Sequence, residues 1–260
     1  MTLTIVKIGG KLLESEALLS QTLQQFAQIK GAKILVHGGG KSASEWSNAL
    51  GIPPNMVDGR RITDAPTLEV VTMVYAGLEN KKVVSQLQAL GCDALGFSGA
   101  DANTILARKR PVKTIDYGFV GDIDQVNAMR INALLKLGLS PVFCAITHDG
   151  NGGLLNTNAD TIAAEMAKAM ANHYEVKLFY CFEKAGVLAD PNDDHSVIAL
   201  IDQATFAAGK KSGAIAAGML PKLENAFAAL LAGVQLVTIG GPEALTGVGG
   251  TQLTLNTLES

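Results

Sequence analysis

A chain of 260 residues, 48% of them hydrophobic and 17% charged, is long enough to bury a large core, as one large domain or as two closely packed lobes. Its formal net charge of -3 argues against a general binder of nucleic acids or anionic membranes, because those partners require concentrated positive potential. Small anionic substrates remain compatible with this balance, since local clusters of basic residues can bind them.

The cysteines and the start of the chain indicate a reducing compartment. Cys92, Cys144 and Cys181 lie in apolar runs at a wide spacing that fits neither a disulfide framework nor a zinc site. The four histidines lack metal-ligand spacing as well, so no metal site made by the protein alone is expected. From Met1 the sequence enters an apolar run without a basic segment or a long hydrophobic stretch, so no signal peptide or membrane span is predicted. We therefore expect a cytoplasmic protein.

Short apolar runs alternate with helix-period segments along the chain. The predicted strands are residues 3–8, 33–36, 93–97, 141–146, 176–181 and 234–239. The predicted helices are residues 19–29, 67–90, 127–137, 160–171 and 220–231. Nearly all of these strands are continuous apolar stretches, which is typical of strands covered on both faces. The alternation predicts an α/β fold, a three-layer αβα sandwich around a mostly parallel open sheet, with ligands at the carboxyl ends of the strands. The polar segment 190–195 predicts a surface turn or hairpin.

Glycine clusters follow the first two predicted strands. Lys7-Ile8-Gly9-Gly10-Lys11 ends the first, and His37-Gly38-Gly39-Gly40-Lys41-Ser42 ends the second, each before a helical segment. Glycines allow backbone amides to approach an anion, and a helix N-terminus adds a favourable dipole. One such junction could be only a tight turn. Two on consecutive strands, both with lysines, favour anion binding.

Three familiar motifs are incomplete. A P-loop ending at Gly40-Lys41-Ser42 needs a glycine where this chain has Leu35. The segment His37-Gly38-Gly39-Gly40 is similar to the oxyanion segment of esterases, but no G-x-S-x-G nucleophile accompanies it. Neither cluster completes G-x-G-x-x-G, so a dinucleotide-binding function has no fingerprint here.

Two later segments carry polar residues at predicted helix starts. Asn158 or Asp160 could cap the helix that follows, and from this segment alone capping is the favoured function. Lys222 follows Pro221 in a first helical turn, where its charge opposes the helix dipole. Such a lysine is tolerated more readily where it serves an anionic ligand.

The ordered set of motifs resembles the N-acetylglutamate kinases of the amino-acid kinase superfamily, over almost the whole chain. The motifs are Lys7-Ile8-Gly9-Gly10, His37-Gly38-Gly39-Gly40, Gly59-Arg60-Arg61-Ile62-Thr63, Asn80-Lys81, Gly96-Phe97-Ser98-Gly99-Ala100-Asp101, Asn156-Thr157-Asn158-Ala159-Asp160 and Gly218-Met219-Leu220-Pro221-Lys222. Each piece is weak by itself, but their order is specific. The resemblance implies the amino-acid kinase fold and MgATP-dependent phosphorylation of the γ-carboxylate of an N-acylated glutamate.

The resemblance also implies roles for individual residues. Lys7 would stabilise the transferring phosphoryl group, Lys222 would act on its nucleotide side, and Asp160 would hydrogen-bond both ammonium groups. This suits a reaction in which catalysis consists mainly of alignment and charge neutralisation. Mg²⁺ is expected to bridge the ATP phosphates, mainly through phosphate and water oxygens.

The remaining expected site residues bind the two substrates. For acylglutamate, Gly39 and Gly40 would hold the γ-carboxylate, while Arg61 and Asn156 would hold the α-carboxylate and the neighbouring amide. The expected phosphate- and nucleotide-binding residues are Gly9, Gly10, Glu183 and Gly186.

The chain departs from the family pattern at two places. Glu183, in Cys181-Phe182-Glu183-Lys184, stands where the family usually has an aspartate. Arg60 adds a second charge beside Arg61, where an aliphatic residue is common. Arg60 as a solvated residue is the simpler interpretation. The alternative is an N-succinylglutamate substrate, whose extra carboxylate would use this charge.

The resemblance predicts two lobes, residues 1–174 for acylglutamate and residues 175–260 for nucleotide, in a homodimer without arginine inhibition. Alternative functions are those of carbamate kinase, glutamate 5-kinase, aspartokinase or uridylate kinase, which share the fold. A non-catalytic ligand-sensing module is a further alternative, which the presence of Lys7, Asp160 and Lys222 disfavours.

Overall fold

A computed structural model describes residues 1–57, 59–190, 192–212 and 219–256. The chain forms two compact units, one made of Met1–Lys33 with Ala163–Ser260 and the other of Ile34–Ile162. This division differs from the two ligand-binding lobes expected from the sequence, because the first strand and the helices after it group with the C-terminal part. Which ligand each part binds stays a prediction. In the described residues no helix is both long and apolar enough to cross a membrane.

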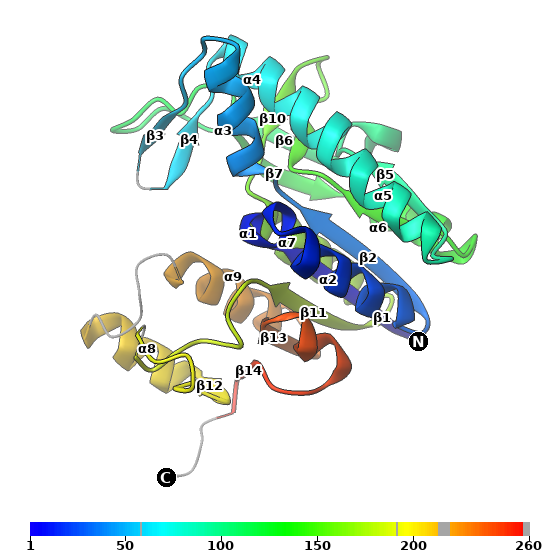
Figure 1. Ribbon diagram of the computed structural model, residues 1–260, viewed down its shortest axis with the longest axis vertical. Helices are drawn as coiled ribbons and strands as arrows, with labels where there is room; N and C mark the ends of the chain where they lie inside the picture. The colour runs from blue at the N-terminus through cyan, green and yellow to red at the C-terminus, as the bar shows by residue number, and fades with distance from the viewer. Residues whose placement is uncertain (58, 191, 213–218, 257–260) are drawn as a thin grey trace. The chain divides into compact units, whose positions relative to one another are not determined.

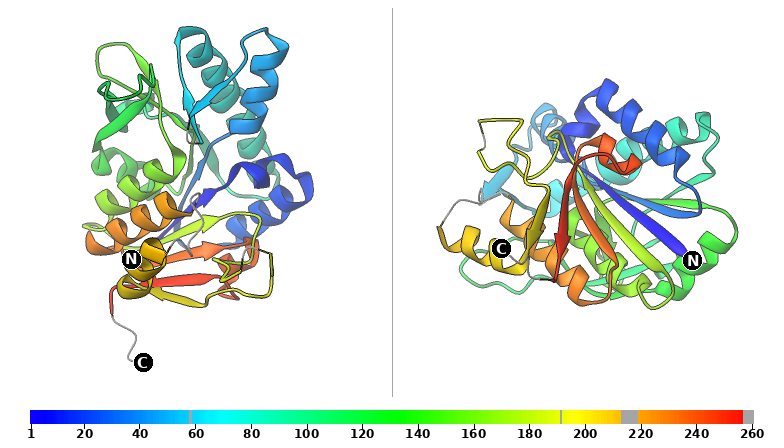
Figure 2. Two further views of the ribbon diagram at one scale, coloured as in Figure 1. Left: turned by 90° about the vertical axis from the view of Figure 1, so that its left-hand side faces the viewer. Right: turned by 90° about the horizontal axis from the view of Figure 1, so that it is seen from below.

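The first unit contains a mostly parallel sheet with helices on both faces. Its elements are β1 (Thr2–Ile8), α1 (Gly10–Glu14), α2 (Glu16–Gln28), α7 (Ala159–Met170, which begins in the second unit), β11 (Glu175–Cys181), β12 (Leu200–Asp202), α8 (Gln203–Ser212), α9 (Leu220–Leu231), β13 (Leu236–Gly240), the 3₁₀ helix η3 (Pro242–Thr246) and β14 (Thr251–Thr254). The strand order is β12-β14-β13-β11-β1, and only the β13–β14 pairing in it is antiparallel. Helices α2 and η3 lie on one face and α9 on the other (Figures 1 and 2).

The burial of β1 explains its continuous apolar sequence. Leu3, Ile5, Val6 and Ile8 are all fully buried, although successive strand residues point to opposite faces. A strand covered by helices on both faces needs apolar residues on both faces, and so not only at alternate positions. The prediction of helix-covered strands is therefore confirmed.

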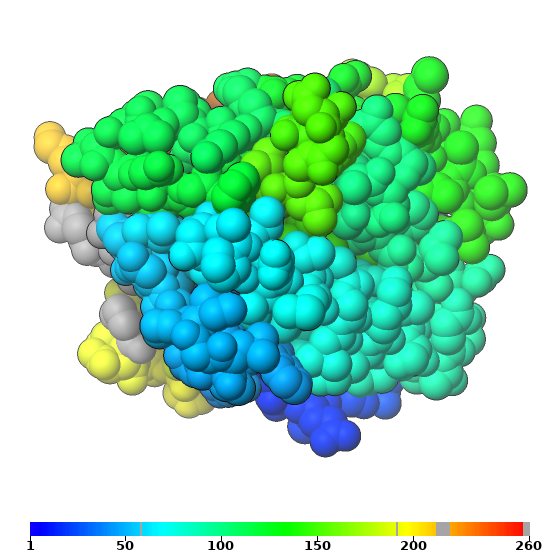
Figure 3. Space-filling model, turned by 90° about the horizontal axis from the view of Figure 1, so that it is seen from above, coloured from blue at the N-terminus to red at the C-terminus, as the bar shows by residue number. Residues whose placement is uncertain are grey.

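The second unit has three parallel strands and an additional four-stranded sheet. Its elements are β2 (Ala32–His37), α3 (Gly40–Ala49), β3 (Asn55–Val57), β4 (Arg60–Ile62), α4 (Ala65–Thr72), the π-helix η1 (Met73–Glu79), α5 (Asn80–Ala89), β5 (Ala94–Phe97), the 3₁₀ helix η2 (Asp101–Asn103), β6 (Ile105–Lys109), β7 (Gly121–Val126), α6 (Ala128–Lys136), β8 (Ser140–Phe143), β9 (Ile146–His148) and β10 (Leu154–Asn156). Strands β2, β8 and β5 are parallel in that order, and β10-β9-β6-β7 form the second sheet. On the face in Figure 3, α3 lies beside α4.

The single helix predicted over residues 67–90 is divided into three parts. A π-helical turn, η1, is inserted between α4 and α5, so seven residues have a wider backbone than an α-helix. The predicted strand 141–146 ends at Phe143, and Ile146 already belongs to β9 of the other sheet. The predicted hairpin at 190–195 is supported by an antiparallel bridge between Leu188 and Val197, while Pro191 lies outside the described residues.

A buried polar network joins β2, α5 and β8 of the second unit. His37 is fully buried, and its Nδ1 lies 2.8 Å from the carbonyl oxygen of Gly38. A carbonyl oxygen only accepts, so Nδ1 carries the hydrogen, and Nε2 accepts from Nδ2 of Asn80 at 3.0 Å. Asn80 Nδ2 also donates to the carbonyl oxygen of Val142 at 2.9 Å. These bonds hold the start of the glycine-rich segment against its neighbouring strand and helix.

Burial lowers the pKa of His37 to about 4, from the ordinary value of 6.5, and the charge of Lys81 acts in the same direction. The hydrogen bond to Gly38 opposes both effects. His37 is therefore neutral in the folded protein at pH 7.

We predict that Gly96→Ala destabilises the protein by about 2–4 kcal/mol, because overpacking at a rigid site is costly. A Cβ at Gly96 would lie 1.9 Å from Oδ1 of Asn80, whose amide is fixed by His37 and Val142. Gly77→Ala is the matched control, since nothing lies within 4 Å of its added Cβ, and it should change stability by less than about 1 kcal/mol. Urea unfolding measures both changes, and equal midpoints for the two variants would contradict the packing argument.

We also predict that His37 makes stability depend on pH between about 4 and 6.5. In this window the unfolded chain binds a proton at His37 and the folded chain does not, so stability falls as the pH falls. The full effect is on the order of 3 kcal/mol. Because carboxylates also titrate there, the measurement is the difference between wild type and His37→Gln in urea unfolding at several pH values. Parallel curves for the two proteins would show that His37 does not titrate in this way.

Candidate active site

The turn into α3 has a backbone that only glycine adopts readily. Gly39, the N-cap residue of α3, has φ 150° and ψ 25°. A Cβ at this position would lie 2.8 Å from Cδ1 of Tyr75 and 3.4 Å from Cγ of Glu79. Gly39 has no side chain that could cap the helix, and a helix start without such a cap is suited to anion binding. The glycine at position 39 is thus required by the backbone and by packing, and anion binding by this segment stays a prediction.

Arg61 lies beside this turn, and one of the two terminal nitrogens of its guanidinium group makes hydrogen bonds. It is on β4 and only 7% exposed. Its Nη2 donates to the carbonyl oxygen of Gly40 at 2.8 Å and to Oγ of Ser44 at 2.7 Å. Its Nη1 is buried and has no hydrogen-bond partner among the described residues. Burial raises the pKa of Tyr75, and the adjacent Arg61 charge opposes that rise.

Asn156, at the end of β10, belongs to the same region. Its Nδ2 donates to Oγ1 of Thr63 at 3.0 Å, and Thr63 follows Arg61 by two residues. The structure thus connects Asn156 to the segment that carries Arg61, and Arg61 to Gly40. All four residues expected to bind acylglutamate lie in the second unit.

The start of α7 shows which of Asn158 and Asp160 caps the helix, a question that the sequence left open. Oδ1 of Asn158 accepts from the backbone N–H of Thr161 at 3.0 Å, which is an N-cap bond. Asp160 is the second residue of the helix and is buried, with 9% exposure. Asn158 is therefore the cap, and Asp160 is left for another function. Asp160 belongs to the second unit, so its expected contact with Lys7 and Lys222 of the first unit stays a prediction.

The first glycine junction lies in the first unit, where β1 and β11 end side by side. The N–H of Gly9 donates to the carbonyl oxygen of Cys181 at 2.8 Å, and a Cβ on Gly9 would lie 3.3 Å from that oxygen. Lys7 is buried near the end of β1, and its charge opposes the burial effect that raises the pKa of Cys181 to about 12. Gly10 begins α1. Lys7 and both glycines are therefore at the carboxyl edge of two neighbouring parallel strands.

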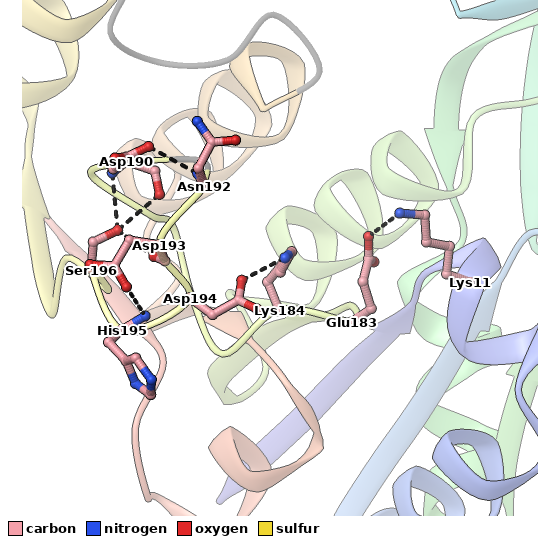
Figure 4. Close-up of polar contacts among 9 residues, drawn as sticks. All are labelled: Lys11, Glu183, Lys184, Asp190, Asn192, Asp193, Asp194, His195 and Ser196. Carbon is pink, nitrogen blue, oxygen red and sulfur yellow. Dashed lines mark hydrogen bonds and ion pairs between the residues drawn. The ribbon is translucent and has the colours of Figure 1, made fainter.

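Glu183, after β11, forms an ion pair with Lys11, after Gly10. The Nζ of Lys11 lies 2.7 Å from Oε1 of Glu183, and the two side chains point toward one another in Figure 4. Burial raises the pKa of Glu183, but the hydrogen bond with Lys11, a backbone hydrogen bond at Glu183 and the charges of Lys11 and Lys184 together outweigh it, so the pKa lies below its ordinary value. Next to this pair, Lys184 binds Asp194 at 2.5 Å. Glu183 is thus charged and paired with the residue that follows the Gly9-Gly10 turn.

Gly186 and Lys222 are the remaining predicted site residues, and they lie in different environments. Gly186 packs against protein atoms, because a Cβ there would lie 2.5 Å from Cγ1 of Val197 and 2.8 Å from Oγ1 of Thr251. This packing alone explains a glycine at position 186, so nucleotide binding by it stays a prediction. Lys222 lies in the first turn of α9, half-buried, as expected from Pro221. Gly218, the first residue of its motif, lies outside the described residues.

Four residues near the acylglutamate-binding set were not predicted: Ser42, Ser44, Tyr75 and Glu79. Tyr75 and Glu79 lie in the π-helix η1, within a segment whose pattern predicts an ordinary core helix. The one sequence feature that pointed to a function for this segment was Glu79, a charged residue in a largely apolar stretch. Among the described residues, no group of three or more His, Cys, Asp or Glu side chains could hold a metal ion.

Comparison with known proteins identifies the family. Residues 2–241 match the amino acid kinase family. The acetylglutamate kinase of Bacteroides fragilis is 55% identical over 251 residues, which are 96% of each chain. The acetylglutamate kinase of Cytophaga hutchinsonii is 52% identical over 244 residues, covering 94% of this chain and 92% of that one.

A solved structure has the same fold. The smu.665 protein of Streptococcus mutans superposes with a TM-score of 0.80 at 26% identity, covering 98% of this chain and 99% of that chain. The fold class expected from the sequence is confirmed by this likeness and by the mostly parallel sheets of both units. By its match over residues 2–241 and its identity to these relatives, the chain belongs to the amino acid kinase family and, within it, to the acetylglutamate kinases.

Proposed function

We propose that this kinase transfers the γ-phosphoryl group of ATP to the γ-carboxylate of N-acetyl-L-glutamate, in arginine biosynthesis. The name shared by its relatives supports the substrate. The observation that carries the proposal is Arg61, a buried guanidinium group whose Nη1 has no hydrogen-bond partner among the described residues. A buried charge with an unused donor favours an anion, and a planar carboxylate fits a guanidinium group.

Each set of residues would have a separate role in binding or in phosphoryl transfer. Gly39 and Gly40 would bind the γ-carboxylate through amides at the start of α3, while Arg61 and Asn156 would bind the α-carboxylate and acyl amide. Lys7 and Lys222 would neutralise the phosphoryl group during transfer, and Asp160 would hold both ammonium groups. No proton has to be removed from a carboxylate nucleophile, so alignment and charge account for the catalysis.

ATP would bring its own metal ion. Gly9 and Gly10 would approach the phosphates, with Glu183 and Gly186 on the nucleotide side. Mg²⁺ would bind phosphate oxygens and water and lower the charge on the phosphoryl group. The described residues form no group of carboxylates to hold the ion independently, so no residue is assigned to it.

The finer properties are proposals as well. We propose a cytoplasmic homodimer without arginine inhibition, as expected from the sequence. The three cysteines are unpaired and buried, which supports a reducing compartment. N-succinyl-L-glutamate is the alternative substrate, and the exposed position of Arg60 leaves its charge available to a second carboxylate.

The test is an ATP-dependent assay in which hydroxylamine traps the acyl phosphate as a hydroxamate. N-acetylglutamate, N-succinylglutamate, glutamate and aspartate are compared side by side. Hydroxamate should form with an acylated glutamate and not with free glutamate or aspartate. A strong preference for acetylglutamate would remove the succinyl alternative, and no product with either acylated substrate would refute the proposed function.

In this assay we predict that Lys7→Ala and Lys222→Ala each lower kcat by on the order of a hundredfold or more, because each removes a preorganised charge from the transition state. Lys30→Ala is the control, since Lys30 is an exposed lysine after α2, and its kcat should stay within about twofold of wild type. Wild-type turnover in either of the first two variants would contradict the assigned roles.

We further predict that Arg61→Lys raises KM for N-acetylglutamate by about tenfold or more and leaves KM for ATP nearly unchanged. Lysine keeps the charge but loses the planar pair of donors. The neighbouring exposed Arg60 supplies the control, because Arg60→Ala should leave KM for N-acetylglutamate within about twofold. Equal increases in both KM values for Arg61→Lys would indicate a general loss of structure instead.

A further inference from the structure

The proposed reaction leaves the buried carboxylate of Glu79 without a function. Glu79 is the last residue of the π-helix η1 and is only 5% exposed. Glutamate is almost never buried to this degree unless its charge is paired or hydrogen-bonded. Its surroundings therefore indicate what it does.

The closest partner of Glu79 is Ser42, in the first turn of α3. Oγ of Ser42 donates to Oε1 of Glu79 at 2.7 Å. Nζ of Lys82 lies 3.8 Å from the same oxygen, but that side chain is 54% exposed. A long, solvent-exposed ion pair contributes little, whereas a short hydrogen bond to a buried carboxylate is strong. Glu79 therefore acts mainly on Ser42.

Ser42 belongs to the turn that is proposed to bind the substrate γ-carboxylate. The same turn is held on another side by Arg61, whose Nη2 donates to the carbonyl oxygen of Gly40. In the same turn, a Cβ at Gly39 would lie close to the ring of Tyr75 and near Cγ of Glu79. The first turn of α3 is thus held by three contacts, and Glu79 supplies the only charged acceptor among them.

The π-helical turn brings the two residues of η1 to the same glycine. Tyr75 and Glu79 are four residues apart, and both approach the Cβ position of Gly39. The π-helix has a wider turn than an α-helix and occurs frequently at functional sites. In an α-helix through residues 73–79, the angle between these two side chains around the helix axis would be different.

We propose that Glu79 is a positioning residue for acylglutamate binding. Its carboxylate accepts the Ser42 hydroxyl hydrogen and thereby fixes the first turn of α3, so that the Gly39 and Gly40 amides stay aligned with Arg61. The hydroxyl is also kept from rotating back to bond the backbone of its own helix, which serine does readily. A negative charge near a helix N-terminus is stabilised by the helix dipole. This inference rests on the proposed function.

The test uses the full chain with Ser42→Ala, Glu79→Ala, the double variant and Glu79→Gln. Each alanine variant should raise KM for N-acetylglutamate by about tenfold, the effect of losing a charge-assisted hydrogen bond, while KM for ATP stays within about twofold. The double variant should be no worse than the single ones, because both remove the same bond. Glu79→Gln should stay within about threefold of wild type, since its amide oxygen still accepts from Ser42.

Glu45→Ala is the matched control. Glu45 lies on the same helix, is 68% exposed and is 4.0 Å from Lys41, so its loss should change neither KM. Melting temperatures are measured for every variant, and activity is measured well below them. If Glu79→Ala does not fold, Ser42→Ala still carries the test, because it removes only one hydroxyl group.

Several outcomes would overturn the proposal. Unchanged KM for N-acetylglutamate in both alanine variants would exclude positioning by Glu79, and additive effects in the double variant would exclude action through Ser42. Tighter substrate binding in Glu79→Gln than in wild type would mean that repulsion between carboxylates is the main effect. A wild-type protein that forms no hydroxamate would refute the proposed function itself, and an active wild type with unchanged variants would refute only the role of Glu79.

Discussion

The close contact between Gly39 and the π-helix η1 fixes the geometry of the second unit around its proposed ligand. Because a Cβ at residue 39 would lie 2.8 Å from the ring of Tyr75, the turn into α3 can approach η1 only as glycine. That approach places Ser42 within hydrogen-bond distance of Glu79 and the Gly40 carbonyl oxygen within reach of Arg61. The orientation of the first α3 amides follows from these contacts.

The sequence predicted the parallel strands well because their signal is strong. A strand buried on both faces has apolar residues on both of them, as Leu3, Ile5, Val6 and Ile8 do within residues 3–8. The short strands β3, β4, β9 and β10 were not predicted, since three residues are too few to show a period. Their pairing depends on contacts between segments that are distant in sequence, such as Asn156 with Thr63.

The candidate site could be predicted in part for a similar reason. Glycine junctions and the order of motifs predict Gly39, Gly40, Arg61 and Asn156, and the structure connects Arg61 to Gly40 and Asn156 to Thr63 near Arg61. Tyr75 and Glu79 could not be assigned, since seven residues are too few for sequence to distinguish a π-helix from an α-helix, and the wider turn is visible only in the structure. Asn158 and Asp160 were ambiguous in sequence, and the bond from Thr161 to Asn158 resolves which one caps the helix.

The charged groups beside the two glycine turns are balanced in different ways, which affects how strongly each turn would attract an anion. In the first unit, Lys11 and Lys184 are neutralised by Glu183 and Asp194. In the second unit, the acceptors beside the Arg61 guanidinium are neutral, namely the Gly40 carbonyl oxygen and the hydroxyls of Ser44 and Tyr75, and no carboxylate among the described residues pairs with it. A buried charge without a counter-ion raises the free energy of the empty protein. A substrate carboxylate would remove that cost on binding, so the burial of Arg61 favours anionic ligands before any further contact is made.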